Sequence, residues 1–84
     1  MRLDTWLWQA RFFRSRSLAC RFIETQRPRM DGRVVEKAHA IVRPGSVVTF
    51  AQGARVRVVR VVSLGERRGP APEARTLYEE IGAA

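Results

Sequence analysis

The chain is 84 residues long, and its 16 Lys and Arg residues against 8 Asp and Glu residues give a formal net charge of +8 at pH 7. A chain of this length can bury one small hydrophobic core, which excludes a deep catalytic pocket beside that core. The charge indicates a polyanionic partner, either nucleic acid or an anionic membrane surface.

The positive charge is concentrated in the first 60 residues. They carry 13 basic and 4 acidic side chains, whereas residues 61–84 carry 3 and 4. All basic residues except Lys37 are arginine, whose planar guanidinium pairs bidentately with phosphate. No apolar run approaches the roughly 18 residues of a spanning helix, and the N-terminus has arginines and Asp4 instead of an apolar signal segment. We therefore expect no membrane partner, and the single Cys20 fits a reducing cytoplasm.

Two short amphipathic helices are predicted at the start of the chain. The first has Asp4 as its expected N-cap and an apolar stripe at helical spacing, formed by Leu3, Trp6, Leu7, Ala10 and Phe13. The second is expected to begin at Ser15 or Ser17, both good N-caps, and to point Cys20, Arg21 and Glu24 outward. Its buried face consists of Leu18, Ala19, Phe22 and Ile23.

Hairpin and strand patterns follow the helices. Asp31 and Gly32 in "PRMDGRVV" can take the positive φ angles of a two-residue turn, which predicts a β-hairpin. Pro44 and Gly45 predict a turn before a strand through Phe50, and "QG" at residues 52–53 marks the next reversal. The expected fold class is therefore α+β, with the helices packed on a small, mainly antiparallel sheet.

The last third of the chain is predicted to hold one more strand and a helix. In "ARVRVVRVVSL", Arg55 and Arg57 are expected to point outward and Val56 and Val58 inward, with a bulge where the alternation slips at Val58 and Val59. Beyond "PAP", a short C-terminal helix is predicted from the i, i+3, i+4, i+7 spacing of Ala74, Leu77, Tyr78 and Ile81.

The turn between the two N-terminal helices is a candidate anion-binding site. Arg14 and Arg16 alternate there with Ser15 and Ser17 at the N-terminus of the second helix. Free backbone N–H groups, the positive end of the helix dipole, two hydroxyls and two guanidiniums converge at this point. A phosphate group is the ligand that this combination favours.

A second basic edge is predicted around the hairpin, and it consists of Arg27, Arg29, Arg33 and Lys37. If the hairpin packs beside the helix pair, these charges flank a groove that could follow a nucleic-acid backbone. On the first helix, Trp8 and Arg11 share a stripe away from the core. Two roles stay open for Trp8, which are packing under the second helix and serving as a cation–π platform for Arg11.

The same residues resemble a known family. The stretches "RLDTWLWQARFFRSRSLA", "MDGRVV" and "RPGSVVTF" are similar to the S4-type RNA-binding domain, a helix-helix-hairpin module. The pair of tryptophans in "WLW" and the segment "ERRGPAPEARTLYEE" narrow the resemblance to the bacterial heat shock protein 15 family. The resemblance covers essentially the whole chain and implies the small S4-type α+β fold, with the S4-type domain over residues 1–64 and a C-terminal segment over residues 65–84.

The resemblance implies a ribosome-associated RNA-binding protein without catalytic activity, cofactor or small-molecule substrate. Members of that family resemble one another in binding large ribosomal subunits that still carry a nascent chain on tRNA, and they are linked to recycling of such subunits after heat stress. The implied partners are therefore rRNA of the large subunit and the tRNA of a stalled chain, and a monomer is expected. Carried over by position, the RNA-binding residues are Arg2, Trp8, Arg11, Arg14, Ser15, Arg16, Ser17, Arg27, Arg29, Gly32, Arg33 and Lys37.

Two departures from the family pattern bear on the local shape. Gln26 stands where a Gly usually ends the second helix, and a left-handed Gln there would cost on the order of 1 kcal/mol. Pro28 stands where a strand valine is usual and has no backbone N–H, which predicts a short edge strand.

Other functions remain open from the residues alone. The chain could be the RNA-targeting module of a larger rRNA-modifying enzyme, a pseudouridine synthase or a methyltransferase, or a basic domain that binds acidic protein segments. The sequence shows no phosphate-binding glycine loop and no paired nucleophile and base, and His39 has no second ligand at metal spacing. Segment 66–74 is either a capped linker or a second nucleic-acid contact through Arg67 and Arg68.

Overall fold

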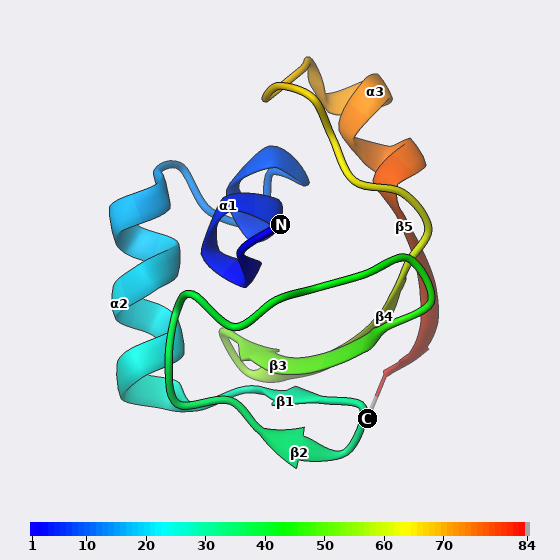
Figure 1. The fold of residues 1–84 in the computed structure, drawn as a ribbon. Helices are drawn as coiled ribbons and strands as arrows, with labels where there is room; N and C mark the ends of the chain where they lie inside the picture. Colours follow the sequence, from blue (N-terminus) through cyan, green and yellow to red (C-terminus); the bar gives the residue numbers. More distant parts are fainter. Residues whose placement is uncertain (84) are drawn as a thin grey trace.

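Two helices lie against one face of an antiparallel sheet in the computed structural model, which describes residues 1–83 (Figure 1). The strand order is β2-β1-β3-β4-β5, and α1 lies between α2 and the β4–β5 side of the sheet. The elements are, in chain order, α1 (Leu3–Gln9), α2 (Arg16–Gln26), β1 (Arg29–Met30), β2 (Arg33–Val34), β3 (Val47–Gln52), β4 (Arg55–Val61), α3 (Ala71–Ala74), the 3-10 turn η1 (Arg75–Leu77) and β5 (Tyr78–Ala83). This arrangement confirms the predicted α+β class.

The hydrophobic core fills the space between the helices and the sheet. Trp6 of α1 is 0% exposed, and its indole N–H donates to the carbonyl of Ser63 at 3.1 Å. Burial of each large side chain of this kind contributes about 1.5–3 kcal/mol of transfer free energy. The other fully buried large side chains are Leu3, Leu7, Ile23, Val42, Val48, Val59 and Val61.

The start of α1 differs from the prediction. Arg2 is the N-cap residue, whereas Asp4 lies inside the first turn and is only 5% exposed. The helix begins early because the chain before it pairs with a distant loop: the Leu3 N–H donates to the Ala40 carbonyl at 2.8 Å, and Arg2 forms a bridge with Ile41. Asp4 is therefore not the N-cap residue, and its carboxylate accepts hydrogen bonds from the Arg2 side chain and from the Thr5 backbone N–H in the first turn.

The end of α1 also differs, since the helix stops at Gln9 instead of continuing to Phe13. Arg11 has a φ of 64°, and this left-handed residue turns the chain so that Phe12 enters the core with 8% exposure. Phe13, which was predicted to be in the core stripe, is half-buried and packs on Phe22 of α2 with a ring distance of 4.9 Å.

Helix α2 begins as predicted. Ser15 is the N-cap, and its hydroxyl accepts a hydrogen bond from the Leu18 N–H at 3.1 Å. At the other end, the left-handed residue is Arg27 with a φ of 50°, and Gln26 remains helical, so the expected strain falls one residue later than predicted.

The hairpin turn is confirmed, with φ angles of 53° at Asp31 and 82° at Gly32. However, β1 is not an edge strand, because it pairs with β2 on one side and with β3 on the other. Pro28 precedes this short strand, so its missing N–H interrupts no strand pairing, and its carbonyl accepts from the Val35 N–H at 2.7 Å.

Strand β4 places Arg57 on the core face, which contradicts the outward orientation predicted for it. The register pairs Phe50 with Arg57 and Val48 with Val59, so Arg57 shares a face with buried residues. Its guanidinium lies 4.9 Å from the centre of the Phe12 ring and pairs with Glu80, and the hydrogen bond to that carboxylate raises the pKa of Arg57.

The C-terminal part is mostly a strand. Helix α3 and η1 are present before Tyr78, but Tyr78 and the residues after it pair with β4 as β5 instead of forming a further helical turn. The predicted irregularity at Val58 and Val59 is confirmed, because the register of β5 shifts between these two residues and Ile81 is the extra residue.

Candidate nucleic-acid interface

The N-terminal end of α2 carries the predicted arginine and serine turn. Arg16 and Ser17 are exposed in the first turn of the helix, and the Arg14 side chain before them is exposed as well. The guanidinium of Arg16 lies 5.4 Å from the centre of the Trp8 ring. Trp8 is therefore a cation–π platform, but its partner on α2 is Arg16 and not the predicted Arg11.

A groove of about 530 Å³ runs between the start of α1 and the exposed face of α2. It is open to solvent, and both arginines and carboxylates line it. Its lining residues are Arg2, Asp4, Thr5, Arg16, Ser17, Cys20, Arg21 and Glu24.

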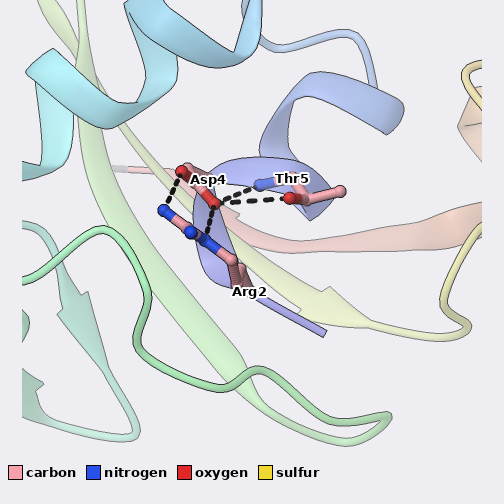
Figure 2. Close-up of polar contacts among 3 residues, drawn as sticks. All are labelled: Arg2, Asp4 and Thr5. Atoms are coloured by element: carbon pink, nitrogen blue, oxygen red, sulfur yellow. Dashed lines mark hydrogen bonds and ion pairs between the residues drawn. The ribbon is translucent and has the colours of Figure 1, made fainter.

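The α1 side of this groove is organised by one carboxylate (Figure 2). Asp4 accepts hydrogen bonds from the Arg2 guanidinium, at 3.1 Å from Nε and 2.9 Å from Nη2, and from the Thr5 backbone N–H at 2.7 Å. The Arg2 side chain is 55% exposed. Arg2 thus lies at the groove wall in a fixed position with part of its guanidinium open to solvent.

The groove contains one thiol, that of Cys20. Partial desolvation, and then the nearby carboxylates of Glu24 and Asp4, raise the pKa of this thiol. A raised pKa keeps the group in its neutral form near pH 7, so Cys20 lacks the thiolate character of a reactive cysteine.

A second hollow, of about 720 Å³, lies beside the hairpin. Asp31, Arg33 and Val34 of the hairpin form one side, and the loop that follows forms the other with Glu36, Lys37 and His39. Val34 is 49% exposed, so this hollow combines apolar surface with two cations.

The two hollows adjoin along the start of α1. The Asp4 N–H donates to the Ala38 carbonyl at 3.2 Å and the Leu3 N–H donates to the Ala40 carbonyl at 2.8 Å. Asp4 lines the first hollow and Ala40 lines the second, so a single pair of neighbouring chain segments separates them. We refer to the residues that line the two hollows together as the basic face.

The basic face gathers some of the predicted site residues and leaves others apart. Arg2, Arg16 and Ser17 line the groove, and Arg33 and Lys37 line the hairpin hollow. Arg14 and Arg29 are exposed but line neither hollow, and Gly32 is at the hairpin tip.

Three predicted residues have other partners. The hydroxyl of Ser15 is occupied as the helix cap. Arg27 forms an ion pair with Glu36 at 3.7 Å, which connects the end of α2 to the loop after the hairpin. Arg11 donates from Nε to the Gly69 carbonyl at 2.7 Å.

Arg21 and Arg68 were not assigned to the site from the sequence. Helical spacing had placed Arg21 on the outer face of α2 without showing that this face borders a groove with Arg2. The sequence allows two roles for the segment that contains Arg68, a capped linker or a nucleic-acid contact. In the structure, the Arg68 guanidinium lies 5.9 Å from the centre of the Trp8 ring.

Some basic side chains of the molecule have an ion-pair partner, and others have none among the described residues. Carboxylates near the C-terminus neutralise basic residues of the same region, in the pairs Arg57 with Glu80, Arg60 with Glu79, and Arg67 with Glu73. Within residues 1–83, no carboxylate lies within ion-pair distance of the basic side chains Arg14, Arg16, Arg21, Arg29, Arg33 and Lys37. The two hollows are thus lined by four cations without an ion-pair partner in the described residues, which are Arg16, Arg21, Arg33 and Lys37, and by carboxylates that lie beyond ion-pair distance of these four.

Comparison with known proteins identifies the family. The family model of the S4 domain matches residues 1–48, which hold α1, α2 and the hairpin. A solved trimeric structure of heat shock protein 15 from Vibrio cholerae superimposes with a TM-score of 0.89 at 36% identity, over 96% of this chain and 81% of that one. The chain belongs to the heat shock protein 15 family of S4-domain proteins.

Curated relatives carry the same family name. The chain is 42% identical over 80 residues to heat shock protein 15 of Escherichia coli K12 and 42% identical over 84 residues to a homolog from Aeromonas salmonicida. These matches cover 95% and 100% of this chain, and 59% and 63% of the relatives. The chain thus spans about three fifths of the length of the curated relatives it matches.

The described part of the chain holds neither a metal cluster nor a membrane-spanning helix. Nowhere in residues 1–83 do three His, Cys, Asp or Glu side chains gather in a way that could hold a metal ion. Over the same residues, no helix has the length and apolar character needed to cross a membrane.

Proposed function

We propose that the chain is a non-catalytic RNA-binding protein whose basic face binds rRNA of the large ribosomal subunit. In this proposal it acts on subunits that still carry a nascent chain on tRNA, and it contributes to their recycling under heat stress in the cytoplasm. Membership in the heat shock protein 15 family supports the assignment.

The observation that carries the proposal is the group of unpaired cations on the basic face. Arg16 and Arg21 on α2 and Arg33 and Lys37 near the hairpin border two adjoining hollows without a carboxylate partner in residues 1–83. Each phosphate that such a side chain neutralises releases a counterion, which makes binding favourable and dependent on salt.

The shape of the face favours a folded RNA over a small ligand. Both hollows are open to solvent and neither is a buried cavity, and backbone hydrogen bonds at the start of α1 join the segments that line them. A shallow surface that tracks a phosphate backbone recognises shape and charge, which is how proteins commonly bind structured RNA. The exposed Val34 gives this surface an apolar contact beside its charges.

The first test is co-sedimentation of the purified chain with separated large and small ribosomal subunits, with free structured RNA and duplex DNA as competitors. We expect selective binding to the large subunit. Equal and salt-labile binding to both subunits, RNA and DNA would contradict the proposal and favour a general nucleic-acid clamp, such as the targeting module of a larger enzyme.

The second test asks whether RNA binds at the N-terminal end of α2. In the double variant Arg14→Ala with Arg16→Ala, the slope of log affinity against log salt should fall by about 1 for each phosphate that the protein no longer neutralises. Arg55→Ala is a suitable control, because Arg55 is exposed at the start of β4 and lines neither hollow. An unchanged slope in the double variant would show that RNA binds elsewhere.

Oligomeric state needs a separate measurement. The solved heat shock protein 15 of Vibrio cholerae is described as trimeric, whereas a monomer was expected for this chain from its sequence. We propose that one copy suffices for RNA binding, since the basic face is formed by residues of a single chain. Light scattering of the free chain and of its RNA complex at several concentrations decides this point.

A further inference from the structure

The segment between β4 and α3 is tied to the end of α1. Arg68 donates from Nε to the Trp8 carbonyl at 3.1 Å, and Arg11 donates from Nε to the Gly69 carbonyl at 2.7 Å. In Figure 1 this segment, drawn in yellow, extends from the sheet to the top of the view, above α1 and next to α3. The segment between β4 and α3, residues 62–70, lies outside the part of the chain that the S4 family model matches, which ends at residue 48.

This contact brings a second guanidinium to the ring of Trp8. The Arg68 guanidinium lies 5.9 Å from the ring centre, and that of Arg16 lies 5.4 Å from it. Cation–π attraction helps to hold both groups in place. Two cations from segments far apart in the sequence thus meet at one aromatic side chain.

Both guanidiniums retain free donors. The hydrogen bond of Arg68 uses Nε, and within residues 1–83 its two terminal nitrogens have no other hydrogen-bond partner. Arg16 makes no side-chain hydrogen bond to any described residue and has no carboxylate within ion-pair distance. The adjacent arginine, Arg67, differs because it is paired with Glu73 at 3.0 Å.

The position of these cations makes an anion favourable. Arg16 is in the first turn of α2, where the helix dipole is positive and positive side chains are disfavoured. The Arg68 guanidinium lies on the same ring as that of Arg16, so a phosphate that bonds to both would offset their charge through charge-assisted hydrogen bonds.

We propose that Arg16, Trp8 and Arg68 form a phosphate-binding site for one backbone phosphate of the bound RNA. Trp8 orients the two guanidiniums, and the segment that carries Arg68 extends the RNA-binding surface beyond the S4 part of the chain. This inference rests on the proposed function and adds to it a contact that the sequence left undecided.

The test compares Arg68→Gln with Arg67→Gln in salt titrations of binding to a structured transcript of large-subunit rRNA. Both substitutions remove one charge from adjacent positions, but Arg67 is paired with a carboxylate, whereas Arg68 lies on Trp8 and has both terminal nitrogens free within residues 1–83. For Arg68→Gln we expect the slope of log affinity against log salt to fall by about 0.9, and the affinity near 0.15 M salt to fall roughly fivefold. For Arg67→Gln we expect both quantities to stay close to those of the unaltered chain.

A structural role of Arg68 predicts a different result. If Arg68 serves only to hold its segment on α1, Arg68→Gln lowers the thermal unfolding temperature and leaves the salt slope unchanged, and this outcome would overturn the proposal. Arg68→Lys retains the charge but loses the Nε bond to Trp8, so it should retain most of the slope.

A measurement on the unaltered chain covers the case in which Arg68→Gln does not fold. Bound RNA should protect Arg68 more than Arg67 from modification by phenylglyoxal, as read by mass spectrometry, and equal labelling of Arg68 with and without RNA would refute the site. A reduced slope in the Arg14 and Arg16 double variant but not in Arg68→Gln would refute this site alone. Absence of salt-dependent RNA binding in the unaltered chain would refute the proposed function as well.

Discussion

The substitution Asp4→Ala should weaken the fold and strengthen RNA binding at the same time. Asp4 is 5% exposed and accepts the Thr5 N–H at 2.7 Å, a bond that serves one of the free donors at the start of α1. Loss of an acceptor at a helix start costs about 1 kcal/mol. The pair with Arg2 adds less than about 1 kcal/mol, because the Arg2 side chain is 55% exposed and water screens the pair.

These terms predict that Asp4→Ala lowers the free energy of unfolding by about 1–2 kcal/mol. For a chain of this size the unfolding temperature should fall on the order of 10 °C. RNA affinity should change in the opposite direction, because a negative charge has left the groove wall and Arg2 no longer pairs with it. At separations of several ångströms in water, removal of one repulsive charge is worth about 0.5–1 kcal/mol, which is roughly a twofold to fivefold gain in affinity.

Urea unfolding and salt titration of binding to structured rRNA measure the two effects separately. Asp4→Asn is the matched control, because its amide oxygen can still accept the Thr5 N–H while its charge is gone. It should show the same gain in affinity with a smaller loss of stability. If neither variant binds RNA more tightly than the unaltered chain, the groove between α1 and α2 is not where the RNA phosphates lie.

Two further predictions concern the hairpin and the groove thiol. Gly32 has a φ of 82°, and an added Cβ would have no heavy atom within 4 Å. Gly32→Ala should therefore lower the free energy of unfolding by about 1 kcal/mol through backbone strain alone. Equal urea midpoints for the variant and the unaltered chain would contradict this account. The pKa of Cys20 is raised by desolvation and by Glu24, so the pH midpoint of its alkylation by iodoacetamide should lie above that of an unstructured cysteine peptide. Glu24→Gln should lower that midpoint toward the peptide value, and a midpoint at or below the peptide value in the unaltered chain would show that the carboxylates do not act on the thiol.

Features that depend on neighbouring residues were predictable from the sequence. The Ser15 cap needs only a hydroxyl three residues before the Leu18 N–H, and the Asp31 and Gly32 turn needs only two residues that tolerate positive φ angles. The turn was predicted and Ser15 was one of the two predicted caps, and both features are confirmed, because their energetics are decided within a few residues of chain.

Features that depend on distant pairing were not predictable. The spacing of Leu77, Tyr78 and Ile81 fits a helix, but the open edge of β4 provides hydrogen-bond partners that draw Tyr78 and its successors into β5. Arg57 alternates with valines in a manner typical of an outward residue, yet its register opposite Phe50 turns it toward the core. Local periodicity carries no information on which strand will lie beside a segment.

The candidate site shows the same division. The sequence by itself determined that the chain is strongly basic, that its charge is concentrated in the first 60 residues, and that a turn of alternating arginines and serines precedes the second helix. The tertiary structure alone decided which cations remain uncompensated, because the carboxylates of β5 pair with Arg57 and Arg60 across the sheet while none reaches Arg16 or Arg21 in residues 1–83. The tertiary structure also places the Arg68 guanidinium on the Trp8 ring. Electrostatic and cation–π interactions depend on distances in space, and these distances are set by how the chain packs.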